Sequence, residues 1–171
     1  SGVVPTTATG PREMGVYVGL YSADYSKLLQ MHNNSQMSAY LATGGALSVA
    51  AGRLSYMYGA QGPAISIDTA CSSSLMTTHM AAESWALGSI SSAVSCGVNF
   101  ILDPVVTASL NQAGVLAADG RCKTLDSAAD GYVRSEACVA FLLAGMQHSD
   151  ESTGLGAGTS AVAAWVVGTA A

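Results

Sequence analysis

The chain has 171 residues, half of them hydrophobic and only 10% charged, with a formal net charge of -5. Since an ordinary soluble domain carries about 25% charged residues, this small polar surface favours part of a larger core, buried against a partner, over a free-standing Ala-rich domain. The six Lys and Arg residues are scattered, which argues against a nucleic-acid surface, and no apolar run reaches the roughly 18 residues that a membrane span needs.

The beginning of the chain predicts one short strand between polar segments. Residues 1–12 form a polar lead-in with Pro and Thr, and residues 15–20 (GVYVGL) predict a buried strand. Residues 24–36 are mostly polar, and Asn33-Asn34 within them is a loop signal.

A helix and a second strand are predicted next. Residues 37–57 show approximate three-and-four apolar spacing, which predicts a helix. Gly44-Gly45 weakens its middle, because each glycine costs about 1 kcal/mol in a helix. A turn at residues 59–63 leads into an alternating strand at residues 64–68 (AISID).

The central part predicts two more helices around a strand. The first helix runs from about Cys71 to Leu87 and is closed by Gly88. Residues 93–98 (AVSCGV) predict a strand. A short helix then starts at Asp103-Pro104 and reaches about Gln112, since Asp can cap a helix and Pro suits its first position.

The last part predicts two strands separated by polar segments. Residues 118–131 read as a loop and residues 132–143 as a strand or hairpin arm. Residues 147–160 read as a Gly- and Ser-rich turn, and residues 161–169 as a final strand. Strands that alternate with helices indicate an α/β architecture, and neither an internal repeat nor a dividing linker is present in the sequence.

One cysteine stands at a predicted strand-to-helix junction, within residues 67–76 (IDTACSSSLM). A free cysteine has a pKa of about 8.5 and reacts as the thiolate, and the N–H groups and dipole at a helix start favour negative charge. The small neighbours Ala70 and Ser72 permit the sharp turn that would lift the Cys71 sulfur clear of both elements. Cys71 is therefore a candidate covalent nucleophile, and a small buried hydrophobe is the alternative.

The residues around Cys71 resemble the active-site segment of ketosynthases, the β-ketoacyl-synthase domains of polyketide and fatty-acid synthases. The resemblance runs in order from about Gly15 to Leu143, some three-quarters of the chain, and is nearer to the multidomain polyketide branch than to stand-alone bacterial enzymes. It is carried by residues 46–56 (ALSVAAGRLSY), 68–75 (DTACSSSL), 97–99 (GVN), 112–116 (QAGVL), 119–124 (DGRCKT) and 130–134 (DGYVR). The chain departs from the family's usual pattern at Gly45, Gly52, Cys96, Ser135 and Ala137.

The resemblance implies a thiolase-like layered αβαβα fold, of which this chain would hold mainly the N-terminal half. Residues 1–171 would be one partial ketosynthase domain, its central part, without the N-terminal region and without the downstream segments that carry the catalytic histidines and lysine. The strings HGTGT and GH, typical of those segments, do not occur in the sequence.

The resemblance also implies an acyltransferase reaction. An acyl group would pass from the phosphopantetheine of an acyl carrier protein to Cys71, and a malonyl-type extender would then condense with it by a decarboxylative Claisen reaction. The implied partners are the carrier protein, whose phosphopantetheine thioester is the delivered group, and a second copy of the chain, with strand 64–67 near the two-fold axis. We expect no tightly bound cofactor, and no nucleic-acid or membrane partner. This chain alone is expected to be inactive in condensation and only marginally stable.

Three histidines and Asp68 are the candidate helpers of Cys71. His79 lies eight residues further along the same predicted helix, about 12 Å along its axis, which is too far for a base. It is therefore expected to be a packed helix residue. His32 and His148 fall in polar loops. Asp68 is expected to make turn hydrogen bonds rather than to transfer protons.

Two other functions stay open. A catalytically silent, ketosynthase-like structural or dimerisation subunit would account for a chain without these histidines, and a cysteine-dependent hydrolase or another thiolase-like acyltransferase would need a histidine near Cys71. For Arg121 and Lys123, contact with a carrier's phosphate and a solvated loop are equally open.

The remaining cysteines are expected to be free thiols. Cys96, Cys122 and Cys138 form no CxxC pair with Cys71 or with each other, so a zinc site is not predicted. Free thiols fit a reducing compartment. Because the start of the sequence lacks the basic and apolar regions of a signal peptide, we expect a cytoplasmic location, with an organellar one as the open alternative.

Overall fold

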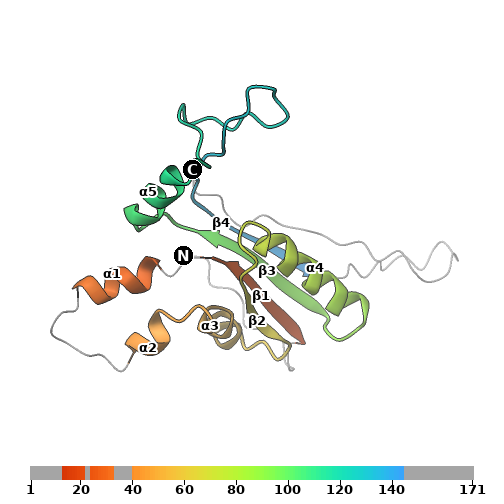
Figure 1. Cartoon of the computed structure of the whole chain (residues 1–171). Helices are drawn as coiled ribbons and strands as arrows, with labels where there is room; N and C mark the ends of the chain where they lie inside the picture. The colour runs from red at the N-terminus through yellow and green to blue at the C-terminus, as the bar shows by residue number, and fades with distance from the viewer. Residues whose placement is uncertain (1–12, 22–23, 33–39, 145–171) are drawn as a thin grey trace, which may run out of the picture.

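The computed structural model describes residues 13–21, 24–32 and 40–144. These residues form a four-stranded sheet with helices on both of its faces (Figure 1). The sheet has the order β2-β1-β3-β4, from β1 (Met14–Leu20), β2 (Ala64–Ile67), β3 (Ser92–Asn99) and β4 (Ala137–Ala144). The lead-in and the segments expected at 147–160 and 161–169 lie outside the described residues.

Strand β1 is at the centre of the arrangement. It pairs in parallel with β2 on one side and with β3 on the other, whereas β3 and β4 are antiparallel. All seven residues of β1 are buried. A strand covered on both faces reads as a continuous apolar run, and this is the pattern on which its prediction depended.

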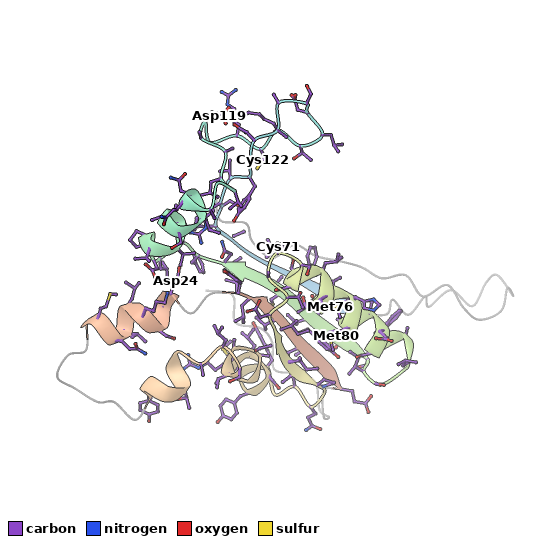
Figure 2. All side chains as sticks on the ribbon, viewed as in Figure 1. Asp24, Cys71, Met76, Met80, Asp119 and Cys122 are labelled. Atoms are coloured by element: carbon purple, nitrogen blue, oxygen red, sulfur yellow. The ribbon has the colours of Figure 1, made fainter. Side chains whose placement is uncertain are left out.

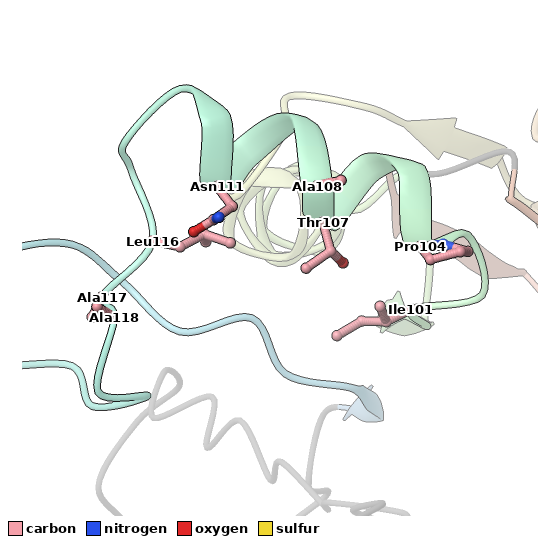
Figure 3. A pocket seen from close by; sticks show the side chains of 8 residues that line it. All are labelled: Ile101, Pro104, Thr107, Ala108, Asn111, Leu116, Ala117 and Ala118. Atoms are coloured by element: carbon pink, nitrogen blue, oxygen red, sulfur yellow. The ribbon is translucent and has the colours of Figure 1, made fainter.

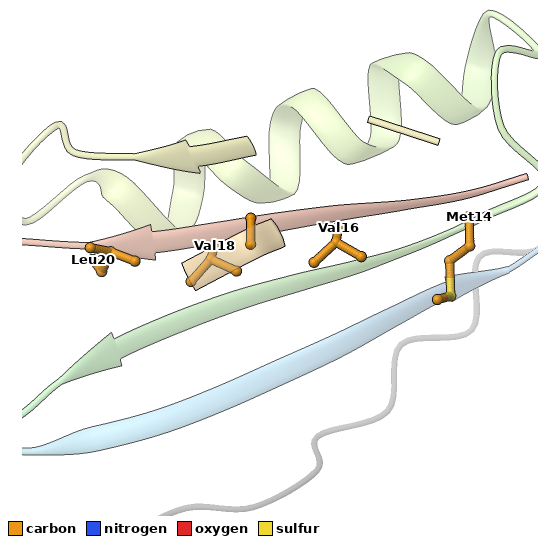
Figure 4. Packing of buried hydrophobic residues seen from close by; sticks show 5 residues of the cluster. Met14, Val16, Val18 and Leu20 are labelled. Carbon is orange, nitrogen blue, oxygen red and sulfur yellow. The ribbon is translucent and has the colours of Figure 1, made fainter. Parts of the chain in front are cut away.

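The two faces of the sheet carry separate apolar clusters. Alternate residues of a strand point to opposite faces. The even-numbered residues of β1, Met14, Val16, Val18 and Leu20, lie on one side of the strand (Figure 4) and pack with helix α3 (Val49–Tyr58). Tyr17 points to the other face, where helix α4 (Ser73–Ala86) packs against β1 and β3. The sheet is therefore the middle of three layers, as the α/β prediction required.

The buried ring of Tyr17 ties α4 to the sheet. Its hydroxyl donates a hydrogen bond of 2.8 Å to Oγ of Ser84 near the end of the helix. Ala81 and Ala93 are fully buried in the same cluster. Small side chains at these positions let the helix lie close to β3.

The first helix corrects the prediction of a polar, loop-containing segment. Helix α1 spans Asp24–His32, so the backbone of His32 belongs to a helix end and not to a loop. Tyr25, Leu28 and Leu29 recur at three- and four-residue spacing, and this is the sequence signal that indicates the helix. The many polar residues around them outweighed it.

The helix expected at residues 37–57 is divided into two. Helix α2 (Leu41–Gly44) is a single turn, and α3 begins only at Val49. At the break, Oγ of Ser26 donates 2.7 Å to the carbonyl oxygen of Gly45, and a β-carbon at Gly45 would collide with that hydroxyl. The Gly44-Gly45 pair thus marks a real interruption. Helix α3 ends at Gly59, whose φ of 61° places it in the left-handed region.

Two predicted boundaries have different outcomes. The strand expected at residues 132–143 begins only at Ala137, because Tyr132 instead bridges to Leu116. Helix α5 (Pro104–Gln112) starts as predicted. The Asp103 side chain accepts a hydrogen bond of 2.9 Å from the amide of Val105, and Pro104 holds the first turn.

Asp103 also joins α5 to α1. Its side chain, only 11% exposed, accepts 2.9 Å from Nζ of Lys27, and its own amide donates 3.1 Å to Oδ2 of the buried Asp24. The hydrogen bond from Lys27, followed by that from the Val105 amide, lowers the pKa of the Asp103 carboxyl. One carboxylate therefore both caps α5 and binds α1.

This lowered pKa predicts an acid-dependent contribution to stability. A carboxyl whose folded pKa lies below its unfolded value of about 3.9 stabilises the fold above that value and loses the effect as the pH falls through the folded pKa. Asp103→Asn keeps a capping side chain but cannot titrate. We expect its free energy of unfolding, measured by urea denaturation, to be lower than wild type near neutral pH and to fall less on going to about pH 3.

The control is Asp126→Asn, a change at an exposed residue that forms no ion pair among the described residues. It should keep the pH dependence of the wild type. Parallel pH curves for Asp103→Asn and the wild type would show that the carboxylate does not link the two helices energetically.

Candidate active site

The link from β2 to α4 is a tight turn with one backbone residue in an unusual conformation. Ala70 has a φ of 56°, in the left-handed region that costs a residue with a β-carbon roughly 1–2 kcal/mol. Cys71 follows it directly. The sharp junction predicted from the small neighbours of Cys71 is therefore present, with its strain at Ala70.

Side-chain hydrogen bonds hold this turn from both ends. Oδ1 of Asp68 accepts 2.9 Å from the Ala70 amide, which confirms the turn role predicted for Asp68. Oγ of Ser73 accepts 2.9 Å from the Thr69 amide and donates 2.6 Å to the carbonyl oxygen of Ala70. Oγ of Ser72 donates to the backbone oxygen and the hydroxyl of Thr69, at 2.8 and 2.9 Å.

Cys71 itself is exposed on this turn (Figure 2). The predicted helix start at Cys71 was early, since Ser72 is the N-cap and α4 begins at Ser73. The Ser72 hydroxyl does not cap the helix, because it is bound to Thr69. No capping side chain therefore stands between the thiol and the positive end of the α4 dipole, which favours a negative charge nearby.

Two glycines let the start of α4 approach the sheet. A β-carbon at Gly19 of β1 would lie 2.8 Å from the carbonyl carbon of Ser73 and 2.8 Å from the amide nitrogen of Ser74. A β-carbon at Gly97 of β3 would lie 2.7 Å from that of Ser74. Sequence reasoning did not assign these residues to the site. A glycine inside a strand does mark a close backbone approach, and that is the signal that could have found them.

His79 is the histidine whose side chain the structure describes, and it does not lie beside Cys71. It is on α4, eight residues and about 12 Å of helix axis beyond the thiol, as the sequence predicted, but it is exposed and not packed as expected. His148 lies outside the described residues. Among the described side chains, no histidine is therefore placed to act as a base for Cys71.

The other cysteines differ from Cys71 in their surroundings. All four cysteines are free thiols, as expected. Cys96 lies on β3, where burial, and to a smaller extent the neighbouring Cys138, raise the pKa of its thiol. Sγ of Cys122 accepts 3.2 Å from the amide of Val133 within its loop. Cys71 alone of the four combines exposure with a helix start.

In the loop between α5 and β4, a lysine forms ion pairs with two aspartates of the same loop. Nζ of Lys123 lies 2.6 Å from Asp130 and 3.1 Å from Asp119. The hydrogen bonds to Asp130 and then Asp119 raise the pKa of Lys123, and Lys123 in turn lowers that of Asp119. This pairing favours the loop interpretation for Lys123 over contact with a carrier's phosphate. Arg121 is exposed, and both interpretations stay open for it.

An open, mostly apolar pocket of about 610 Å³ lies beside α5 (Figure 3). Thr107, Ala108 and Asn111 of the helix face residues 116–118 across it. Its lining includes no residue of the Cys71 turn, so the pocket and the thiol are separate features of the described chain.

The described residues hold neither a metal centre nor a membrane-spanning helix. No group of three or more His, Cys, Asp or Glu side chains there could hold a metal ion. None of the helices in that part of the chain has the length and apolar character to cross a membrane.

The sequence matches a known family model and several curated proteins. The model for the N-terminal domain of β-ketoacyl synthases matches residues 1–149. The highly reducing polyketide synthase g433 of Fusarium sp is 40% identical over 140 residues, 81% of this chain. A phenolphthiocerol/phthiocerol polyketide synthase of Mycobacterium tuberculosis is 38% identical over 143 residues, 84% of this chain.

Solved structures give the same result. A ketosynthase from module 6 of the bacillaene synthase of Bacillus subtilis 168 superposes with a TM-score of 0.67 and 37% identity over 77% of this chain. An oxazolomycin ketosynthase domain of Streptomyces albus JA3453 gives 0.65 and 33% over 75%. The chain spans only 6% and 8% of the two curated relatives and 22% and 23% of the two solved chains.

The contact of Gly19 with the start of α4 predicts the effect of adding one methyl group. Gly19→Ala would push its β-carbon into the backbone of Ser73 and Ser74, and we expect a loss of about 1–3 kcal/mol in the free energy of unfolding, measured by urea denaturation. The matched control is Gly52→Ala in α3, where a β-carbon meets nothing within 4 Å and should add up to about 1 kcal/mol. Equal stabilities of Gly19→Ala and the wild type would show that the helix start is not seated on β1.

Proposed function

The chain belongs to the β-ketoacyl synthase family, and we propose that it is the part of a polyketide-synthase ketosynthase that carries the acyl-accepting thiol, Cys71. The observation that carries this proposal is the exposed sulfur on a hydrogen-bonded turn directly before α4. Sequence similarity supports the reaction class, and the turn supports the choice of residue.

In the first half-reaction, the Cys71 thiolate attacks the thioester carbonyl carbon of an acyl group on phosphopantetheine. The bond to the carrier's sulfur breaks, and the carrier leaves as a thiol after taking up a proton. The α4 dipole favours the thiolate before the attack. The Cys71 amide can bind the oxyanion that forms during it, since the amides of residues 69, 70, 72 and 73 already donate to protein oxygens. The acyl carrier protein is thus the proposed partner.

In the second half-reaction, a malonyl-type extender on a carrier loses carbon dioxide, and its carbanion attacks the acyl-Cys71 thioester. The new carbon–carbon bond forms as the bond to the Cys71 sulfur breaks, which regenerates the thiolate. No histidine side chain that the structure describes lies near Cys71, and we propose that the groups assisting decarboxylation come from the rest of the parent protein. The chain alone should then not condense.

The silent structural subunit remains the second candidate. It is favoured by the departures around Glu136, where Ser135 and Ala137 replace the family's usual glycines. Those residues still tie β4 to the end of β3, because the Asn99 side chain donates 2.7 Å to the Ser135 carbonyl and Oε1 of Glu136 accepts 2.8 Å from the Ile101 amide. HGTGT and GH segments in the parent protein would favour the enzyme.

The hydrolase alternative receives no support from a neighbouring histidine. Hydrolysis of a Cys71 thioester would need a base within about 3 Å of the attacking water, or a base that reaches this water through one bridging water molecule. His79 is exposed and too far along α4. We therefore retain acyl transfer as the proposed reaction.

Pairing of two copies along β2 is the proposed mode of dimerisation. Among the described residues β2 pairs with β1 alone, which leaves its other edge without a strand neighbour. Unpaired strand edges are templates for pairing with another chain, and the family resemblance implies a homodimer. We expect the full-length protein to sediment at the mass of a dimer in analytical ultracentrifugation. Monomeric sedimentation at micromolar concentration would contradict this assembly.

Acylation of Cys71 tests the proposed function directly. Incubation of the full-length protein with an acyl thioester or with cerulenin should add one acyl or inhibitor mass to the peptide that contains Cys71, detected by mass spectrometry after proteolysis. Cys71→Ala should abolish the adduct, whereas Cys138→Ala, at another exposed thiol, should retain it. An unmodified Cys71 in the folded protein would reject the proposal.

A further inference from the structure

We propose that Ser73 is a positioning residue for Cys71. Its buried hydroxyl forms two hydrogen bonds that clamp the left-handed turn at Ala70, and so holds the thiol at the N-terminus of α4. This inference rests on the proposed function of Cys71. It concerns a residue in the middle of three consecutive serines, Ser72, Ser73 and Ser74, whose hydroxyl groups have different environments.

The first step is the strain at Ala70. A residue with a β-carbon and a φ of 56° is strained by roughly 1–2 kcal/mol and keeps that conformation only where the surroundings hold it. Release of the turn would bring φ to a negative value. Because Cys71 is the next residue, its side chain would then be carried away from the helix start.

The second step is the geometry of the clamp. The Ser73 hydroxyl reaches both sides of Ala70, since it accepts from the Thr69 amide at 2.9 Å and donates to the Ala70 carbonyl at 2.6 Å. The Ala70 carbonyl and the Cys71 amide belong to one rigid peptide plane. Fixing the carbonyl therefore fixes the plane from which the Cys71 side chain departs.

The third step is the anchorage of Ser73 itself. The residue is 5% exposed, and its backbone lies against Gly19 of β1 at a distance that excludes a β-carbon there. The clamp is thus attached to the sheet and not to a mobile surface. Strand β1 fixes Ser73, and the Ser73 hydroxyl in turn fixes the turn that carries the thiol.

The neighbouring serines do not share this role. Ser72 is exposed and its hydroxyl binds Thr69 alone, on one side of Ala70. Ser74 is exposed, and within the described residues its hydroxyl takes no part in the hydrogen bonds that close the turn. Ser74→Ala is therefore a matched control for Ser73→Ala, one residue away on the same helix.

The test measures the rate at which iodoacetamide alkylates Cys71 at neutral pH, in the folded full-length protein, by mass spectrometry of the Cys71 peptide. Ser73→Ala should lower this rate about three- to tenfold, because the thiol loses its fixed place at the helix start. Ser73→Thr, which keeps a hydroxyl, should restore the wild-type rate, and Ser74→Ala should leave it unchanged.

A purely structural role gives a different result. It would lower the melting temperature of Ser73→Ala but leave the alkylation rate of the folded protein at its wild-type value, and this outcome would overturn the inference. If Ser73→Ala does not fold, Ala70→Gly/Ser73→Ala removes the strain that the clamp opposes, since glycine accepts a positive φ. That double variant should fold and still show the lowered rate, and a wild-type rate there would also overturn the inference.

The two proposals can fail separately. Alkylation by iodoacetamide requires only a thiolate, whereas transfer from an acyl thioester requires the proposed acyl-accepting function. Normal acylation of Cys71 together with an unchanged alkylation rate in Ser73→Ala would reject the positioning role alone. Absence of acylation in the wild type would reject the proposed function.

Discussion

The close contact between the backbone of β1 and the first turn of α4 sets the position of everything around Cys71. It exists because Gly19 has no side chain at the point where the helix meets the strand, and Gly97 gives the same clearance on β3. A helix usually packs on a sheet through its side chains. Here the backbone of the first turn of α4 lies directly against the backbone of β1, so the turn before the helix has little freedom to move.

Polar side chains then complete the turn without covering the thiol. Asp68, Ser72 and Ser73 use their oxygens on backbone groups of residues 69 and 70, so the strained Ala70 is held from several sides. None of these bonds involves the Cys71 sulfur, which stays exposed. The arrangement combines a rigid backbone with an accessible nucleophile, the combination that covalent catalysis needs.

The rest of the described chain forms a second unit of structure beside this one. Asp103 joins α5 to α1, and Lys123 closes the following loop on two carboxylates. Both are built from hydrogen-bonded ion pairs with solvent-exposed members, Lys27 in the first and Asp119 and Asp130 in the second, and such pairs contribute less to stability than apolar burial. The apolar core lies under α3 and α4, where it supports the turn of Cys71.

The sequence by itself determined the four strands of the described sheet apart from the start of β4, the helix after Cys71 and the capped start of α5, because alternation, helical spacing and capping residues act within a few positions of one another. It also placed the candidate nucleophile at its junction and identified the family. It did not reveal the contact of the α4 backbone with Gly19, the pairing of Lys123 with Asp130 or the late start of β4. These features depend on groups that meet only after the chain has folded, and no spacing along the chain reports which backbone a glycine will face. Helix α1 was missed for a different reason, since a weak apolar pattern among polar residues becomes decisive only when Asp103 and Lys27 join it to α5. Local rules thus chose the elements, and only the tertiary structure decided the contacts that hold the thiol in place.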